Sequence, residues 1–396
     1  MLLSIAFILL VGMFAGWICK KLHLPSLLGM ILTGIILGPY TLNLIDDSIL
    51  NISSELRKIA LIIILTRAGL SLDLKDLKQV GRPAILMCFV PACFEILGMI
   101  ILAPMLLGVS IIEAAIIGTV TAAVSPAVIV PKMLRMMEEG YGVDKGIPQL
   151  ILAGASVDDI FVIVLFSAFT GLVQEGTISL LSFLQIPISI VLGIIIGVLI
   201  GYLLTKYFSV VHIRDSVKVI IILCISFILV TLEDNFSSII PFSSLISIMC
   251  IGISMQKEKQ ILANRLSLKF NKLWIGAEII LFVLVGATVN LKYALASGIS
   301  AVILILGAVI FRIVGVFCCL IKTKLELKER LFCMMAYMPK ATVQAAIGGV
   351  PLAMGLSCGN IVLTVAVLSI LITAPIGAFF IDVSYKALTN KKIIES

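Results

Sequence analysis

The stretch Thr121-Ala-Ala-Val-Ser-Pro-Ala-Val-Ile-Val-Pro131 interrupts an apolar segment with two prolines, and Met338-Pro-Lys-Ala-Thr-Val-Gln344 interrupts a second one. Pro126 and Pro339 each lack a backbone N–H and disfavour helical backbone in the preceding residue. Each segment is therefore expected to form a broken helix whose free carbonyls and amides are tolerated only inside protein. An ordinary proline kink is the alternative for either segment taken alone.

The two segments occupy corresponding places in halves that are offset by 217 residues, from 69 to 286 and from 94 to 311. Gly69-Leu-Ser-Leu-Asp-Leu-Lys75 aligns with Gly286-Ala-Thr-Val-Asn-Leu-Lys292, and Phe94-Glu-Ile-Leu-Gly98 aligns with Phe311-Arg-Ile-Val-Gly315. The matched helices are an odd number of spans apart, so they cross the bilayer in opposite directions. This predicts an inverted-topology repeat, which is typical of secondary transporters with a site near the midplane.

The composition identifies the class of protein. Of 396 residues, 61% are hydrophobic and 13% charged, against about 45–50% and about 25% in soluble domains. This excludes soluble enzymes and nucleic-acid-binding proteins and predicts an all-α polytopic membrane protein with about thirteen transmembrane helices. The expected spans are 2–19, 26–41, 55–73, 82–107, 112–134, 148–174, 183–206, 215–233, 239–255, 270–290, 297–322, 328–355 and 359–382.

The connections between these spans predict the orientation. Most of the 29 Lys and Arg lie in the odd-numbered connections and the C-terminal tail. The positive-inside rule then places the N-terminus outside and the C-terminus in the cytoplasm. We expect an integral protein of the plasma membrane, surrounded by lipid.

Charged residues inside the spans predict the site. Five of them lie about ten to thirteen residues from the expected cytoplasmic ends, namely Glu95, Asp158, Asp159, Arg312 and Lys340. Each costs about 2.5–3.5 kcal/mol if it faces lipid without a partner, so together they mark an ion path inside the protein. Because Glu95 and Arg312 are equivalent in the two halves, we expect a direct ion pair between them. Arg312 is then a fixed counter-charge, and Lys340 is placed to compensate half-helix dipoles.

The adjacent Asp158 and Asp159 are the strongest candidates for ion binding. Neighbouring residues of a helix point about 100° apart, so the two carboxylates share one depth and differ in surroundings. A buried carboxylate that takes up either a proton or a hard cation makes the two compete. The predicted Na⁺ ligands are Asp159, Asp158, the hydroxyls of Ser125 and Ser156, and backbone carbonyls from Thr121 onward. The alternative is a packing network in which the acids only neutralise Arg312 and Lys340.

The chain resembles the monovalent cation/proton antiporter superfamily, and most closely its NHA branch. The resemblance rests on Arg67-Ala-Gly-Leu, Ser125-Pro126-Ala, Val157-Asp158-Asp159-Ile and Met338-Pro-Lys-Ala-Thr-Val-Gln-Ala-Ala345. It implies a homodimer with elevator-like movement of a core domain, with Asp159 as the main cation and proton site. Two positions depart from relatives: Ser125 stands where many have Asp, and Arg312 where many have Lys.

The resemblance also implies a division of the chain. The segments are 1–81 (mainly dimerisation), 82–182 (first half of the core), 183–290 (linker and dimerisation helices), 291–390 (second half of the core) and 391–396 (a tail too short for a nucleotide-binding regulatory domain). The predicted function is Na⁺ (or Li⁺)/H⁺ antiport, with no enzyme activity and no cofactor. K⁺/H⁺ antiport by the same site and, from another class, sodium-coupled symport of an organic solute remain as alternatives.

Overall fold

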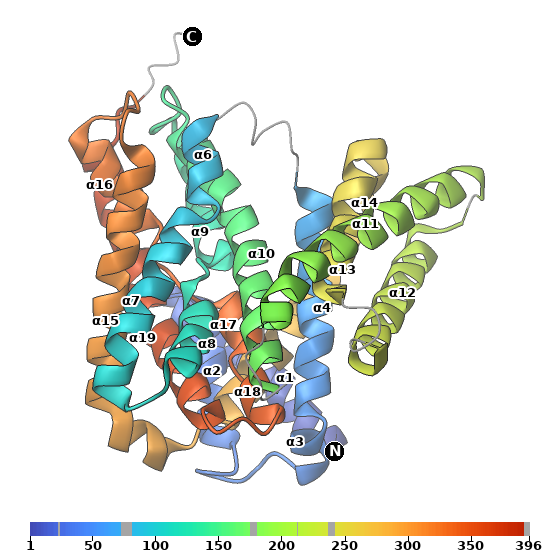
Figure 1. Ribbon diagram of the computed structural model, residues 1–396, viewed down its shortest axis with the longest axis horizontal. Helices are drawn as coiled ribbons and strands as arrows, with labels where there is room; N and C mark the ends of the chain where they lie inside the picture. Colours follow the sequence, from blue (N-terminus) through green and yellow to red (C-terminus); the bar gives the residue numbers. More distant parts are fainter. Residues whose placement is uncertain (23, 73–80, 175–179, 212, 237–241, 392–396) are drawn as a thin grey trace. The chain divides into compact units, whose positions relative to one another are not determined.

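The computed structural model describes residues 1–22, 24–72, 81–174, 180–211, 213–236 and 242–391, and these form helices joined by short connections (Figure 1). The expected tail lies outside the described residues beyond Lys391. In chain order the helices are α1 (Leu2–Lys21), α2 (Ser26–Leu37), α3 (Asp47–Asn51), α4 (Ser53–Ser71), α6 (Arg82–Met87), α7 (Val90–Leu107), α8 (Ile111–Ala122), α9 (Pro126–Glu139), α10 (Ile147–Gln174), α11 (Leu180–Val210), α12 (Asp215–Phe236), α13 (Ser244–Glu258), α14 (Gln260–Ala287), α15 (Leu291–Leu320), α16 (Leu327–Ala336), α17 (Thr342–Ile347), α18 (Val350–Ala353) and α19 (Gly359–Leu388).

Every expected span coincides with a helix or a broken helix, and the all-α membrane fold is confirmed. Within the described residues, nine helical segments are long and apolar enough to cross a membrane, so the number thirteen stays a prediction. One boundary was wrong: α14 begins at Gln260 and not near 270. Its first turns carry Lys, Arg and Gln, which favour helix as well as apolar residues do, and hydropathy does not detect such an extension.

The chain divides into two compact units, which are described separately. The larger comprises Met1–Ser54, Asp76–Phe166 and Leu281–Ser396, and the smaller comprises Glu55–Lys75 and Ser167–Ile280. In the larger unit α7 lies along α15 (Figure 1). A Cβ atom on Gly98 would lie 2.7 Å from Phe311, and one on Gly315 would lie 3.0 Å from Phe94. These reciprocal contacts join the matched segments of the repeat, as a two-fold relation requires.

In the other matched segment the equivalent glycines also pack closely, each against a different helix. In the larger unit Gly286 of α14 packs against α2, where a Cβ atom would lie 2.1 Å from the carbonyl oxygen of Ile31. In the smaller unit its counterpart Gly69 of α4 packs against α13, 2.2 Å from the carbonyl oxygen of Met249. Residues 73–75 of this match lie outside the described residues. Both alignments therefore mark positions of close helix packing, and the reciprocal contacts between α7 and α15 support the inverted repeat.

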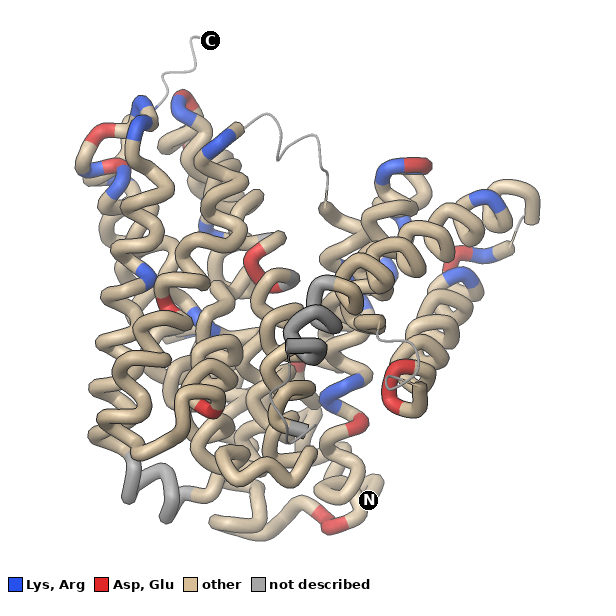
Figure 2. Tube along the Cα trace, viewed as in Figure 1, with Lys and Arg blue, Asp and Glu red and all other residues tan. Residues whose placement is uncertain are grey.

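Lys and Arg lie mainly at helix ends (Figure 2). In the larger unit, Lys145 between α9 and α10 binds Glu326 and Glu329 at the start of α16, at 3.2 and 2.9 Å. Tyr141 and Lys391 form an isolated antiparallel bridge. The connections that precede α10 and α16 and the end of α19 therefore meet at one end of this unit.

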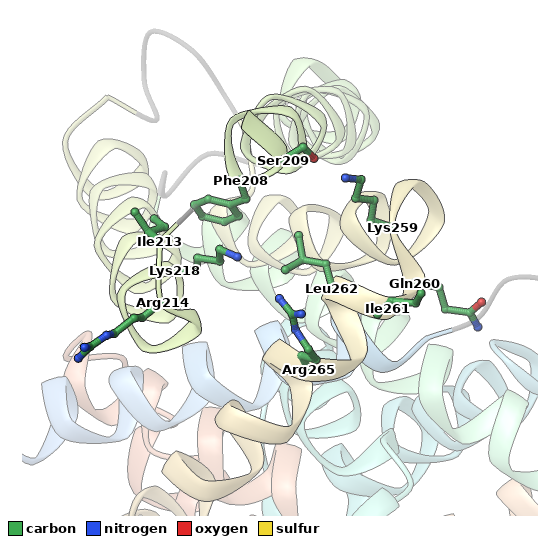
Figure 3. Close-up of a pocket in the computed structure, with 10 residues that line it drawn as sticks. All are labelled: Phe208, Ser209, Ile213, Arg214, Lys218, Lys259, Gln260, Ile261, Leu262 and Arg265. Atoms are coloured by element: carbon green, nitrogen blue, oxygen red, sulfur yellow. The ribbon is translucent and has the colours of Figure 1, made fainter. Parts of the chain in front are cut away.

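The smaller unit contains a basic cavity of about 870 Å³ between the end of α11 and the starts of α12 and α14. Its charged lining residues are Arg214, Lys218, Lys259 and Arg265. Figure 3 shows Lys218 and Arg265 pointing into the cavity, and both donate hydrogen bonds to Asp215, at 3.3 and 3.1 Å. This cavity is made by residues other than those of the predicted ion site.

Candidate functional site

Both predicted breaks are present in the larger unit. Helix α8 ends at Ala122, the backbone is extended at Ala123 and Ser125, and α9 begins with Pro126. The second break separates α16 from α17. The N–H of Ser125 donates to the carbonyl oxygen of Pro339, 2.8 Å away. The two broken helices therefore meet at their non-helical segments.

Arg312 connects the two breaks. Its side chain is fully buried and donates from Nη1 to Glu95 (3.0 Å) and from Nη2 to Asp158 (2.8 Å). It also donates from Nε to the carbonyl oxygen of Tyr337 (2.7 Å) and from Nη1 to that of Ala122. A guanidinium group, with five donors in a rigid fork, suits this role. The expected Glu95–Arg312 pair is confirmed, and the additional bond to Asp158 is one that the packing-network alternative predicted.

Lys340 completes the buried charge network. Its Nζ lies 2.5 Å from Glu95, and its backbone N–H donates to Thr373 Oγ1 at 3.0 Å. The ammonium group is thus paired with a carboxylate, in addition to its position at a helix break. Arg312 and Lys340 carry two positive charges, and Glu95 and Asp158 carry two negative charges. The net charge of these four side chains is therefore zero.

The two adjacent aspartates have different environments. Asp158 is fully buried, and its Oδ2 accepts hydrogen bonds from Arg312 and from the N–H of Val124 at 2.8 Å. Asp159 is half-buried, and its Oδ1 is a buried atom without a hydrogen-bond partner among the described residues. The packing-network alternative therefore describes Asp158 in part, while Asp159 keeps an oxygen available for a ligand.

Within the part of the chain that the structure describes, further buried oxygen atoms without hydrogen-bond partners lie on α10, at the first break and on α17. They are Ser125 Oγ, Asp158 Oδ1, Thr342 Oγ1 and Gln344 Oε1. Native proteins leave few such atoms, and those that remain require an explanation such as an unseen ion or water. Carboxylate, hydroxyl and amide oxygens are the ligands that hard cations prefer.

Two predicted ligands remain, Thr121 and Ser156. The hydroxyl of Thr121 donates within its own helix, to Ile117 at 2.9 Å and to Gly118 at 3.2 Å. Its carbonyl oxygen accepts from Gln344, 3.2 Å away. The side chain of Ser156 lies outside the described residues.

Sequence reasoning assigned no role to Gln344 or Tyr337. Gln344 ends the quoted second segment, and Tyr337 immediately precedes it. Both act on neighbours through hydrogen bonds that composition does not reveal. Their position beside the Met338-Pro-Lys motif was the one available signal.

Two helix breaks that meet beside buried ion pairs are typical of secondary transporters. The family model described as "Sodium/hydrogen exchanger, transmembrane" matches residues 5–383. The chain belongs to this family of sodium/hydrogen exchangers. It is an integral membrane protein of the cation/proton antiport class, and its relatives are transporters.

Two human relatives are also described as sodium/hydrogen exchangers. Sodium/hydrogen exchanger 9B2 of Homo sapiens is 35% identical over 387 residues, which cover 93% of this chain and 70% of the relative. Sodium/hydrogen exchanger 9B1 of Homo sapiens is 31% identical, with coverage of 91% and 72%. A solved structure of the sodium proton antiporter MjNhaP1 from Methanocaldococcus jannaschii matches with a TM-score of 0.85 at 21% identity, over 97% of each chain. The structural match supports the fold.

Proposed function

We propose that this protein exchanges Na⁺, or Li⁺, for H⁺, and that cation and proton compete for Asp159. The observation that carries the proposal is the difference between the two aspartates. Asp158 is paired with Arg312 (2.8 Å), whereas Asp159 has no ion pair among the described residues; the Oδ1 atom of each is buried and has no hydrogen-bond partner there. A carboxylate of this kind can hold either one proton or one cation. Whichever is bound must leave before the other can bind.

Neutral oxygen atoms complete the proposed cation shell. Ser125 Oγ is buried without a partner at the first break. Ser156, three residues before Asp159, and the second lone pair of the Thr121 carbonyl are the other ligands that we propose. Asp158 contributes through Oδ1 while its Oδ2 remains with Arg312. Asp158 and Asp159 are therefore the sodium ligands that carry charge.

The movement that alternates access is proposed to be elevator-like. Segments 82–182 and 291–390 form the moving core, and 1–81 with 183–290 form the scaffold through which two copies associate as a homodimer. The crossed breaks support a core that moves as a body, because Arg312 and the Ser125–Pro339 hydrogen bond tie its halves together. We further propose a plasma-membrane location with the N-terminus outside and the C-terminus in the cytoplasm.

The test is uptake of ²²Na⁺ by acid-loaded proteoliposomes, with Na⁺, Li⁺ and K⁺ as competitors. Wild-type protein is expected to take up Na⁺, with competition by Li⁺ and little by K⁺. Asp159→Asn abolishes exchange, because an amide cannot hold a proton or balance a cation. Asp234→Asn, the same substitution in a surface pair with Lys58, leaves exchange unchanged.

Each alternative predicts a different result. Stronger competition by K⁺ than by Na⁺ favours K⁺/H⁺ antiport. Uptake that requires an added organic solute favours symport. Wild-type rates in a well-folded Asp159→Asn protein contradict the proposed site.

A further inference from the structure

Gln344 lies where the two halves of the repeat meet. It is in the first turns of α17 and is fully buried. Its Nε2 donates to the carbonyl oxygens of Thr121 and Ala123, at 3.2 and 2.8 Å. Of the two amide atoms, only the nitrogen can face two carbonyl oxygens, because the oxygen is an acceptor. The hydrogen bonds therefore assign Nε2 to the side of the two carbonyl groups and leave Oε1 free for another contact.

Gln344 Oε1 is buried and has no hydrogen-bond partner among the described residues. A buried acceptor without a partner lowers stability unless something else occupies it. The residues that follow Ala123 belong to the proposed cation site: Val124 donates to Asp158 Oδ2, and Ser125 Oγ is also without a partner. The amide that carries this free oxygen is thus held, through its Nε2, against the carbonyl group of Ala123, directly before Val124 and Ser125.

We propose that Gln344 is a specificity-determining ligand of the transported cation, which its Oε1 binds directly. This inference rests on the proposed function, since it adds a ligand to the site at Asp159. An amide oxygen is a neutral ligand for hard cations. The amide oxygen therefore strengthens cation binding without adding a charge to the site. The exchange of one cation for one proton at Asp159 keeps the same stoichiometry.

The two hydrogen bonds explain how Gln344 discriminates between ions. They fix the amide on α8, so that Oε1 lies at one distance from the ion and cannot follow a smaller one inward. Selectivity among hard cations depends on cavity size, ligand number and rigidity. Removing one rigid ligand therefore weakens binding of Na⁺ more than that of Li⁺, which needs fewer oxygen atoms.

The experiment compares Gln344→Leu with Gln344→Glu in the proteoliposome assay and measures KM for Na⁺ and Li⁺. Both substitutions remove the Nε2 donor, but Glu keeps an oxygen at the ligand position. Gln344→Leu is expected to raise KM for Na⁺ about tenfold, equivalent to about 1.4 kcal/mol, and KM for Li⁺ by less. Gln344→Glu is expected to keep or lower KM for Na⁺ and to shift the pH profile of exchange toward alkaline values.

Gln149→Leu is the matched control. Gln149 Oε1 is also buried and finds no partner among the residues that the structure describes. This residue lies ten positions before Asp159 on α10, about 15 Å along the helix. The control is expected to keep the wild-type ratio of KM values for Na⁺ and Li⁺.

A purely structural role for Gln344 gives a different pattern. Leu and Glu would then slow exchange alike, with both KM values and their ratio unchanged, and this result overturns the proposal. If Gln344→Leu fails to fold, Gln344→Asn replaces it, because its shorter amide is expected to change the ratio in the same direction. An unchanged ratio in folded Gln344→Asn also overturns the proposal. Failure of wild-type exchange, in contrast, contradicts the proposed function itself.

Discussion

The two halves of the repeat are equivalent in fold but supply buried groups of opposite charge. The first half of the chain supplies the buried acids, Glu95 and Asp158, and the second half supplies the bases, Arg312 and Lys340. A pseudo-two-fold axis brings equivalent positions together, so identical residues at 95 and 312 would place like charges in contact. The repeat therefore determines where the groups meet, and divergence of the two sequences makes the contact favourable.

The same asymmetry applies to the backbone of the breaks. Carbonyl oxygens at the end of α8, which carry the negative end of a helix dipole, accept hydrogen bonds from Arg312 and Gln344. The N–H of Val124 donates to Asp158. The second half thus supplies the side chains that stabilise the carbonyl groups of the first break.

The largest effect is expected for Arg312→Met. This change leaves Glu95, Asp158 and two carbonyl oxygens without their shared donor, and breaking a buried ion pair in this way costs about 3–5 kcal/mol. We expect little folded protein and a strongly reduced Tm in detergent. Arg312→Lys, which restores the charge without the fork, is expected to recover part of the stability. Wild-type Tm in Arg312→Met would show that the second half does not stabilise the first break.

A smaller effect is expected when the charges of the repeat are exchanged. The double variant Glu95→Arg/Arg312→Glu retains an acid and a base at the two equivalent positions, so it should be more stable than either single variant. It should not exchange ions, because the carboxylate at position 312 would face Asp158, and like charges in contact cost several kcal/mol. Thermal unfolding and ²²Na⁺ uptake measure the two properties. Full activity of the double variant would show that exchange does not depend on which half supplies the acid and which the base.

Lys145→Met tests the charge pairs at the surface, where the polarity is reversed: the first half supplies the base, and Glu326 and Glu329 of the second half supply the acids. The hydrogen bond to Glu329 raises the pKa of Lys145 above its ordinary value. The stabilisation is therefore complete below about pH 10 and is lost only as the pH rises through the raised pKa. Solvent screens the partly exposed Lys145 and Glu326, but Glu329 is fully buried and loses its cation. We therefore expect Tm to fall by about 4 °C, equally at pH 6 and pH 8. A loss at pH 6 alone would contradict this assignment.

The smallest expected effect is the response of exchange to voltage, which should be absent. In the proposed mechanism Glu95 and Asp158 remain paired with Lys340 and Arg312, and Asp159 alone exchanges one proton for one cation. Reversal of a sodium gradient, measured under an imposed membrane potential, should occur at the same point at every voltage. A reversal point that moves with voltage would mean that a second group releases a proton.

The sequence predicted the fold to the extent that apolar length, proline and repeat register determine it. The offset of the repeat placed Glu95 opposite Arg312, and Pro126 and Pro339 marked the breaks. The roles of Asp158 and Asp159 in pairing were not predictable, because residues about 100° apart on a helix look alike until the neighbour that faces each is known. Gln344 was missed for a similar reason: its function depends on two carbonyl groups of another helix.

Proton release on sodium binding tests competition at Asp159 most directly. Purified protein in detergent, in weakly buffered solution at fixed pH, is titrated with Na⁺ while the released protons are measured. The structure predicts at most one proton for each Na⁺ bound, a release that diminishes as the pH rises and Asp159 loses its proton, and no release from Asp159→Asn. Sodium binding without proton release at any pH, or undiminished release from Asp159→Asn, would contradict competition at this carboxylate.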